Sequence, residues 1–289
     1  MQATDSVINV SSVPHLSPFR YPGGKTWLIP YVRQWLGAKE NKPAVLVEPF
    51  CGGGVVSLTS VFEDLVERAV MVEIDSSVAA VWQAMLNGES TWLANAIGSF
   101  AMSKETVCDV LAGDSSAIRD IAFRTLLRNR VSMGGILAPG AGLLNKGEAG
   151  KGLQSRWYPE TIKKRIIAIA SKKDRFQFVN VDGISVLREY RRRKTAVFFI
   201  DPPYMSPSKR RLYLHNSIDH RRLFETVNSL AGDFLMTYDV TDDALKLAQE
   251  FGFETATVVM KGTRNARLEE LLIGRDLGWL TEASVAIQE

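Results

Sequence analysis

The segment Asp201-Pro202-Pro203-Tyr204 combines residue types that suit chemistry on an amino group. It follows the apolar run 196–200, and because proline cannot continue a central strand, the two prolines predict a fixed extended turn at a strand end. The carboxylate of Asp201 and the carbonyl of Pro202 then offer two acceptors for the two N–H protons of an amino group. The ring of Tyr204 is suited to stack on a base taken out of a duplex. We predict that Asp201, Pro202 and Tyr204 are catalytic; the alternative is a Pro-Pro turn beside an incidental aspartate.

The segment Glu48-Pro49-Phe50-Cys51-Gly52-Gly53-Gly54 is a second candidate, at the end of another apolar run. Its glycines let the backbone come close to a ligand, but their spacing differs from the dinucleotide-binding fingerprint. An acidic residue ahead of the glycines suits a cationic ligand better than a phosphate. The amino group and sulfonium of S-adenosylmethionine are such a ligand. A tight structural turn is the alternative.

Asp75 and Lys25 extend this candidate binding site. Asp75 follows the apolar run 69–73, where a carboxylate can accept both ribose hydroxyls of an adenosine moiety. The alternative is a helix cap, for a helix that Ser76 can also cap. Lys25 ends the loop 19–25, which holds an aromatic pair and two glycines, and it could pair with a cofactor carboxylate. A simple Pro-Gly turn before a helix fits that loop equally well.

Short apolar runs alternate with segments of helical spacing along most of the chain. This alternation predicts an α/β fold with a mostly parallel sheet covered by helices. The runs 255–260 and 270–273 predict an antiparallel hairpin at the sheet edge. The other predicted strands are 44–48, 69–73, 176–180, 196–200 and 234–238, and the predicted helices are 26–36, 55–66, 76–87, 182–193 and 220–230.

One stretch departs from this pattern. Helical spacing at 116–131 and 159–172 flanks a loop, 133–152, that contains seven glycines. So long a loop in a compact domain is either functional or disordered. We predict an inserted, small, mainly helical domain at 107–173, and a catalytic domain made of 1–106 and 174–289.

The charges are unevenly distributed. Residues 119–221 hold 22 Lys/Arg against 8 Asp/Glu, a net +14 within a chain whose net charge is +3. A basic middle between acidic ends predicts a surface that meets a polyanion, with a solvated basic face as the alternative. Lys163 to Arg165, Arg191 to Lys194 and Lys209 to Arg211 are candidates for phosphate contacts, and Arg130 and Arg156 for base edges. The predicted nucleic-acid-binding residues are Arg128, Arg130, Arg156, Lys163, Lys209 and Arg210.

Composition excludes several classes of protein. Two cysteines, Cys51 and Cys108, make no disulfide framework and fit the cytoplasm, and three histidines make a zinc site improbable. No apolar run is long enough to span a bilayer, and residues 1–15 are too polar for a secretory signal. We expect a cytoplasmic protein that needs neither a membrane nor a metal.

Taken in order, the motifs resemble the DNA adenine N6-methyltransferases of the Dam type. In that family the recognition domain lies between the cofactor motifs and the Asp-Pro-Pro-Tyr motif. The matching pieces are Tyr21-Pro22-Gly23-Gly24-Lys25, Glu48 to Gly54, Glu73-Ile74-Asp75 and Asp201-Pro202-Pro203-Tyr204, although the family usually has Trp-Ala at positions 21 and 22.

The resemblance implies a Rossmann-like methyltransferase sheet and an S-adenosylmethionine pocket. Phe50 and the glycines after it would lie near the methionine part, and Asp182 near the adenine. The implied cofactor-binding residues are Tyr21, Gly23, Gly24, Lys25, Glu48, Phe50, Gly52, Gly54, Asp75, Asp182 and Asp201.

The expected activity is methyl transfer to N6 of a flipped adenine in double-stranded DNA. The same chemistry would suit N4 of cytosine, N6 of adenine in RNA, or a glutamine side chain. Asp rather than Asn at position 201, together with the insert, favours a base in DNA. A nucleic-acid-binding module without catalysis and a nicotinamide-dependent oxidoreductase are the more distant alternatives. Restriction-modification, phage protection and replication or repair marking are all compatible roles.

Overall fold

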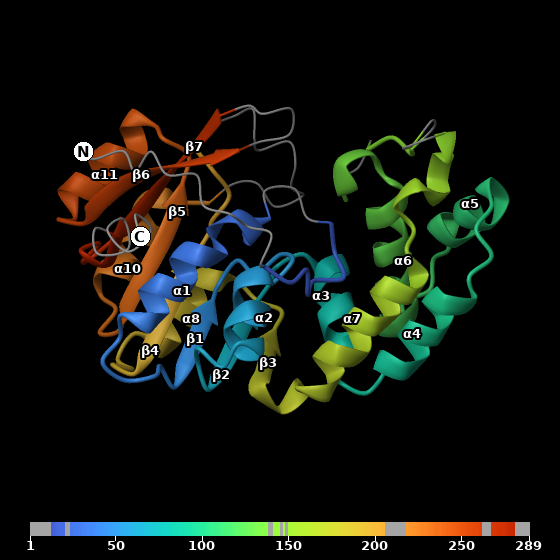
Figure 1. Cartoon of the computed structure of the whole chain (residues 1–289), viewed down its shortest axis with the longest axis horizontal. Coiled ribbons are helices and arrows are strands. Elements are labelled where there is room, and N and C mark those ends of the chain that lie inside the picture. Colours follow the sequence, from blue (N-terminus) through green and yellow to red (C-terminus); the bar gives the residue numbers. More distant parts are fainter. Residues whose placement is uncertain are drawn as a thin grey trace, which may run out of the picture.

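The computed structural model describes residues 13–20, 24–137, 141–144, 147, 150–205, 218–261 and 267–280 (Figure 1). These residues build a seven-stranded sheet with the order β3-β2-β1-β4-β5-β7-β6. Strands β1 to β5 pair in parallel, whereas β7 runs antiparallel to both β5 and β6. The fold is therefore the predicted α/β fold, a mostly parallel, Rossmann-like sheet with an antiparallel terminal hairpin. The strands are β1 Val45–Glu48, β2 Arg68–Val72, β3 Phe176–Val179, β4 Ala196–Ile200, β5 Asp233–Tyr238, β6 Glu254–Lys261 and β7 Arg267–Gly274.

The strand order places a switch point in the middle of the sheet. From β1 the chain builds outward through β2 to β3, and it then returns to lay β4 on the other side of β1. Helices leave neighbouring strands in opposite directions at such a point, so a crevice opens beyond the carboxyl ends of the two strands. Glu48, the last residue of β1, lies at this edge with the residues after it, 49–54. The residues that follow β4, Asp201 to Tyr204, lie at the same edge.

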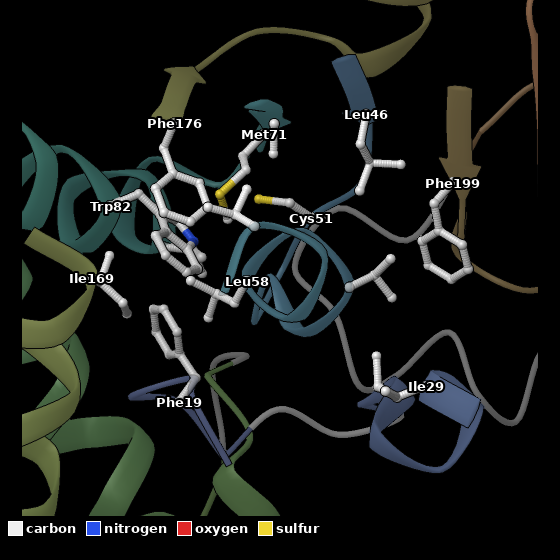
Figure 2. Close-up of a cluster of buried hydrophobic side chains, with 14 of the residues drawn as sticks. Phe19, Ile29, Leu46, Cys51, Leu58, Met71, Trp82, Ile169, Phe176 and Phe199 are labelled. Carbon is white, nitrogen blue, oxygen red and sulfur yellow. The ribbon is translucent and has the colours of Figure 1, made fainter. Parts of the chain in front are cut away.

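Each face of the sheet has its own hydrophobic core. Because successive side chains of a strand point to opposite faces, Leu46 and Phe199 join one core, and Val47 and Phe198 join the other. Figure 2 shows Leu46 and Phe199 on one side of α2 and Leu58 on its other side, within the same cluster. The helices of the first face are α1 Ile29–Gly37, α2 Val55–Phe62 and α3 Ser76–Leu86; those of the second are α8 Gly183–Tyr190, α10 His220–Asn228 and α11 Asp242–Glu250.

A helical unit lies between α3 and β3 in the chain. It forms one end of the molecule in Figure 1, beyond β3, and it contains the predicted insert 107–173 together with the preceding helix, which begins at residue 90. Its Leu126 and Ile166 belong to the same buried cluster as Trp82 of α3. The unit therefore shares a continuous core with the sheet domain. Its helices are α4 Ser90–Ser99, α5 Lys104–Ala112, α6 Ile118–Val131 and α7 Pro159–Ser171, and the short helices of the chain are η1 Lys25–Leu28, η2 Met133–Gly135, η4 Gly152–Arg156 and η5 Lys173–Arg175.

The N-terminal segment 13–20 packs between these two parts. Phe19 is buried, and its ring centroid lies 6.0 Å from that of Trp82. Figure 2 shows Phe19 next to Trp82, with Ile169 of α7 close by. The buried side-chain amide of Asn129 on α6 holds the backbone of Arg20. It accepts a hydrogen bond from the Arg20 N–H at 2.8 Å and donates one to the Arg20 carbonyl at 3.0 Å. Across the described residues, no helix has the length and apolar character needed to cross a membrane.

Candidate active site

Lys25 is the centre of a buried polar cluster at the carboxyl edge of the sheet. Its ammonium lies 3.0 Å from Oδ1 of Asp201 and 2.9 Å from Oε1 of Glu270, and it also contacts the hydroxyl of Tyr204. The Tyr204 hydroxyl in turn donates to Glu270. Lys25 is 6% exposed and Glu270 is 1% exposed, whereas Asp201 is 23% exposed. The cluster thus joins η1, β7 and the segment after β4, with Asp201 at its open side.

The charges of this cluster compensate one another. Burial alone would lower the pKa of Lys25, but the neighbouring carboxylates of Asp201 and Glu270 outweigh burial and raise it. Burial raises the pKa of Glu270, and Lys25 opposes that rise. The cationic form of Lys25 is therefore favoured at neutral pH. The sequence predicts a cofactor carboxylate as the partner of Lys25, but in this structure its partners belong to the chain itself.

Asp201 is held through one of its two oxygens. Oδ1 accepts from the hydroxyl of Thr237 on β5 at 2.7 Å and also faces Lys25. Within the described residues, Oδ2 has no hydrogen-bond partner. The arrangement fixes the carboxylate and leaves one acceptor for an incoming N–H group, next to the buried Pro202.

Tyr204 is placed differently from its predicted role as a stacking platform. The residue is 9% exposed, its hydroxyl lies between Lys25 and Glu270, and the Lys25 ammonium sits 4.9 Å from its ring centroid. In this conformation Tyr204 contributes to the buried cluster, and its ring is largely covered.

The glycine loop after β1 depends on two left-handed residues. Gly52 has φ 45° and Gly54 has φ 63°, conformations that L side chains rarely adopt. A Cβ on Gly54 would lie 2.4 Å from the Met71 side chain and 2.8 Å from Trp82. Trp82 also donates its indole N–H to the carbonyl of Gly52 at 3.0 Å. The loop is therefore locked against β2 and α3, and packing alone requires glycine at position 54.

Two buried carboxylates line the same edge. Oε2 of Glu48, the last residue of β1, accepts from the backbone N–H of Ser57 at 3.0 Å. Burial is the main cause that raises the pKa of Glu48 to about 8, and Asp201 and Glu73 add to the rise. Glu73 accepts from the backbone N–H groups of Gly52, Ile74 and Asp75 at 2.9 to 3.0 Å, so it joins the loops after β1 and β2. Among the described residues neither carboxyl has a cationic partner, and buried carboxyls of this kind suit a site for a cation.

Asp75 and Asp182 both cap helices at this edge. Asp75, rather than the predicted Ser76, is the N-cap of α3, and its Oδ1 accepts from the N–H groups of Ser77 and Val78 at 2.8 and 3.4 Å. Asp182 is the N-cap of α8 and accepts from Ile184 at 3.3 Å. Each cap uses one carboxylate oxygen, so the second oxygen remains able to accept from a ligand hydroxyl.

Most of the predicted cofactor residues lie at the carboxyl edge of the sheet. Glu48, Phe50, Gly52, Gly54, Asp75 and Asp201 follow β1, β2 and β4, which are neighbours in the sheet, and Asp182 follows β3 at its border. Gly24 is exposed at the start of η1, next to Lys25. Tyr21 and Gly23 lie outside the described residues.

The predicted nucleic-acid-binding residues are also divided. Arg128, Arg156 and Lys163 are half-buried on the helical unit. Arg130 differs from the prediction of a base-edge contact, because α6 turns it toward residues 17–20, where it is 3% exposed and donates to the carbonyl of Pro18. Lys209 and Arg210 lie outside the described residues.

Sequence reasoning missed three residues of this site: Glu270, Thr237 and Glu73. Glu270 stands in the apolar run of β7, and an acidic residue in a buried strand is a signal of a paired charge. Thr237 sits in the apolar strand β5 without any such signal. Glu73 belongs to the motif Glu73-Ile74-Asp75, for which the sequence predicts a role in cofactor binding only for Asp75.

The sequence matches no protein-family model and no curated protein. Solved structures align along most of the chain at low identity. The rRNA methyltransferase aviRa from Streptomyces viridochromogenes is 10% identical, with 97% of both chains covered and a TM-score of 0.42. Spermidine synthase from Thermotoga maritima is 11% identical over 96% of this chain and 62% of its own, with a TM-score of 0.38. Precorrin-6y C5,15-methyltransferase from Geobacter metallireducens is 9% identical over 93% of both chains, with a TM-score of 0.35. These overlaps are loose, so the chemistry has to be derived from this chain's own residues.

Proposed function

We propose that the protein is an S-adenosylmethionine-dependent methyltransferase of the Dam type that methylates N6 of adenine in DNA. The observation that carries the proposal is the placement of Asp201. It stands after β4 at the switch point of the sheet, at the same edge as the glycine loop. Lys25 and Thr237 fix its Oδ1, and within the described residues Oδ2 has no partner.

The residues around the glycine loop suit the cofactor. Bound S-adenosylmethionine would supply an electrophilic methyl group on a cationic sulfur. Glu48 and Glu73 place two buried carboxyls beside the loop, where positive charge on the ligand would be favoured. The second oxygen of Asp75 can accept from ribose hydroxyls while the first continues to cap α3. Asp182 stands at the border of the same edge, where it can face the adenine.

The role of Asp201 is to prepare the amino group for attack. Its Oδ2 and the carbonyl of Pro202 accept the two N–H protons of the adenine amino group. These hydrogen bonds would draw the nitrogen lone pair out of conjugation with the ring. They would also stabilise the positive charge that grows on nitrogen as the new N–C bond forms and the bond from the methyl carbon to the sulfonium sulfur breaks, its electron pair going to sulfur. The surplus proton leaves the nitrogen for solvent after transfer. Lys25 and Thr237 keep Asp201 in position, so most of the catalytic effect comes from orientation and electrostatics.

DNA as the substrate is supported by the helical unit and its charge. The unit precedes β4 in the chain, and Arg128, Arg156 and Lys163 lie on it. Such residues can hold backbone phosphates beside the active-site edge while a base is flipped into it.

The test is transfer of a tritiated methyl group to DNA, RNA and protein in parallel, followed by mapping of modified adenines. We expect label in DNA only, and loss of label by at least about 100-fold in Asp201→Asn, which keeps the shape of the side chain but weakens its acceptor. Asp174→Asn, at an exposed position of η5, is the matched control and should retain full activity. Label in RNA or protein would overturn the DNA assignment, and undiminished turnover of Asp201→Asn would overturn the role of Asp201.

A further inference from the structure

A pocket of about 460 Å³ lies between the N-terminal segment, the start of η1 and the helical unit. Four arginines line it: Arg20, Arg130, Arg156 and Arg165. None of the described residues that line the pocket is acidic. Four guanidinium groups that converge without a carboxylate among the described lining residues repel one another, and an anion would relieve that repulsion. We call this site the arginine pocket.

Three of these arginines, Arg20, Arg130 and Arg165, keep hydrogen-bonding capacity that the described residues do not use. Arg130 donates one Nη to the carbonyl of Pro18, but its Nε is buried without a hydrogen-bond partner in the described chain. The same holds for Nη1 of Arg20. Arg165 donates to the carbonyl of Ser17 at 2.9 Å, which leaves further N–H groups of its guanidinium. Buried N–H groups without an acceptor are costly, so the pocket calls for a ligand with several acceptor oxygens.

The electrostatics agree with this geometry. Burial is the main cause that lowers the pKa of Arg130 to about 9, and the charges of Arg165, Arg20 and Arg156 lower it further. Burial and the charge of Arg156 lower the pKa of Arg20 as well. In both arginines burial is the larger cause of the lowered pKa, neighbouring guanidinium charge adds to it, and Tyr158 opposes it.

The position of the pocket indicates the source of the anion. Gly24, Thr26 and Val55 also line the pocket. Gly24 and Thr26 flank Lys25, and Val55 follows the glycine loop of the candidate active site. Tyr158, which is 50% exposed, adds an aromatic ring to the lining. A site with arginines, a ring at its surface and room for more than one small group suits a nucleotide unit within a strand.

We propose that the arginine pocket binds a phosphate group of the nucleic-acid strand that carries the target base. The proposal rests on the proposed function for the identity of the strand, but its test measures binding alone. Because Asn129 fixes the backbone of Arg20 to α6, a phosphate held here would also tie the helical unit to the residues just before Lys25.

The experiment measures binding by fluorescence anisotropy with short labelled DNA duplexes and their RNA counterparts. Arg20→Gln is the first variant, since its guanidinium has a buried N–H without a partner and its backbone anchor to Asn129 is unaffected. Arg165→Gln is the second. The matched control is Lys173→Gln, at an exposed position of η5 that is neither a predicted phosphate contact nor among the residues lining the pocket. We expect each arginine variant to weaken strand binding about 10-fold or more, and the control to bind within about twofold of the unmodified protein.

A second arm locates the phosphate. Single uncharged methylphosphonates are placed at successive backbone positions of the duplex. At one or two adjacent positions we expect the substitution to weaken binding to the unmodified protein but not to Arg20→Gln, because the variant has already lost that contact. Weakening that is equal in both proteins at every position would overturn the proposal.

A third arm separates a strand phosphate from a free one. The melting temperature of the protein is measured in chloride and in inorganic phosphate, with phosphate concentrations up to that of the chloride. We expect little difference from chloride. Tight stabilisation by inorganic phosphate, together with unchanged strand binding of Arg20→Gln, would show a free-anion site and overturn the proposal. If the pocket effects are found on RNA, or without any methyl transfer, the proposed function fails while the phosphate site stands.

Discussion

The ammonium of Lys25 lies 3.0 Å from Oδ1 of Asp201, which joins the first residue of η1 to the carboxylate that follows β4. Because Glu270 on β7 lies 2.9 Å from the same ammonium, one lysine balances two carboxylates contributed by distant parts of the chain. The cluster makes the orientation of Asp201 depend on the loop that also borders the candidate cofactor site.

Lys25→Met should destabilise the protein and abolish methyl transfer. The change leaves the buried carboxylate of Glu270 and the half-buried carboxylate of Asp201 without their cation, at a cost of about 3–5 kcal/mol in unfolding free energy. Urea denaturation followed by circular dichroism measures it. Lys42→Met, which removes an exposed pair with Asp64, is the control and should leave the urea midpoint nearly unchanged.

Adding Glu270→Gln to Lys25→Met separates stability from chemistry. The double variant removes one of the two unpaired carboxylates, so it should regain part of the lost stability while activity stays absent. A double variant that is less stable than Lys25→Met would contradict the charge balance described for the cluster.

Glu48 should make cofactor binding depend on pH. In the free protein its pKa is raised to about 8, so near neutral pH the carboxyl is largely protonated, whereas a cationic ligand favours the ionised form. S-adenosylmethionine affinity should therefore rise as the pH increases toward about 8 and level off above it. Calorimetric titration of the unmodified protein and of Glu48→Gln checks this, since the ligand's own titration is common to both. Parallel pH profiles would refute the assignment.

The raised pKa of Glu48 also makes the unfolding free energy depend on pH. A carboxyl whose folded pKa lies above its unfolded value favours the folded state at low pH, and that contribution is lost as the pH rises through the folded pKa. Relative to Glu48→Gln, the unfolding free energy of the protein without cofactor should fall between about pH 4.5 and pH 8. Urea midpoints across this range test it.

Gly54→Ala should weaken both folding and cofactor binding. The new Cβ would meet Met71 at 2.4 Å and Trp82 at 2.8 Å, on a residue with φ 63°. Overpacking and left-handed strain together cost about 2–5 kcal/mol. Gly88→Ala separates the two effects, because Gly88 also has a positive φ but its Cβ would meet nothing within 4 Å. An equal loss of stability in the two variants would mean that backbone strain alone accounts for the result.

The residues that sequence patterns predicted well belong to short, local motifs. The strand β4 and the segment Asp201-Pro202-Pro203-Tyr204 follow from an apolar run stopped by proline, and the loop after β1 follows from its glycines. Parallel strands then bring both to the same edge, so their proximity also follows from the fold class.

The partners of those residues could not be read from local patterns. Glu270 and Thr237 meet Asp201 and Lys25 only because β5 and β7 are neighbours and β5 pairs with β4. The burial of Arg130 depends on the packing of α6 against the segment 17–20. The helical unit begins at residue 90 because α4 packs with α7 around a core shared with the sheet domain.

Thr237 should act as a positioning residue rather than as a catalytic one. Its hydroxyl donates to Oδ1 of Asp201 at 2.7 Å, so Thr237→Val removes one of the contacts that fix the carboxylate while keeping the shape of a buried side chain. We expect kcat to fall about 10-fold with KM nearly unchanged, because Asp201 acts on the amino group mainly in the transition state. Unfolding free energy should change by only about 0.5–1.5 kcal/mol. Thr237→Ser, which keeps the hydroxyl, should restore most of kcat. If Thr237→Ser is as slow as Thr237→Val, packing by the methyl group rather than the hydrogen bond explains the loss.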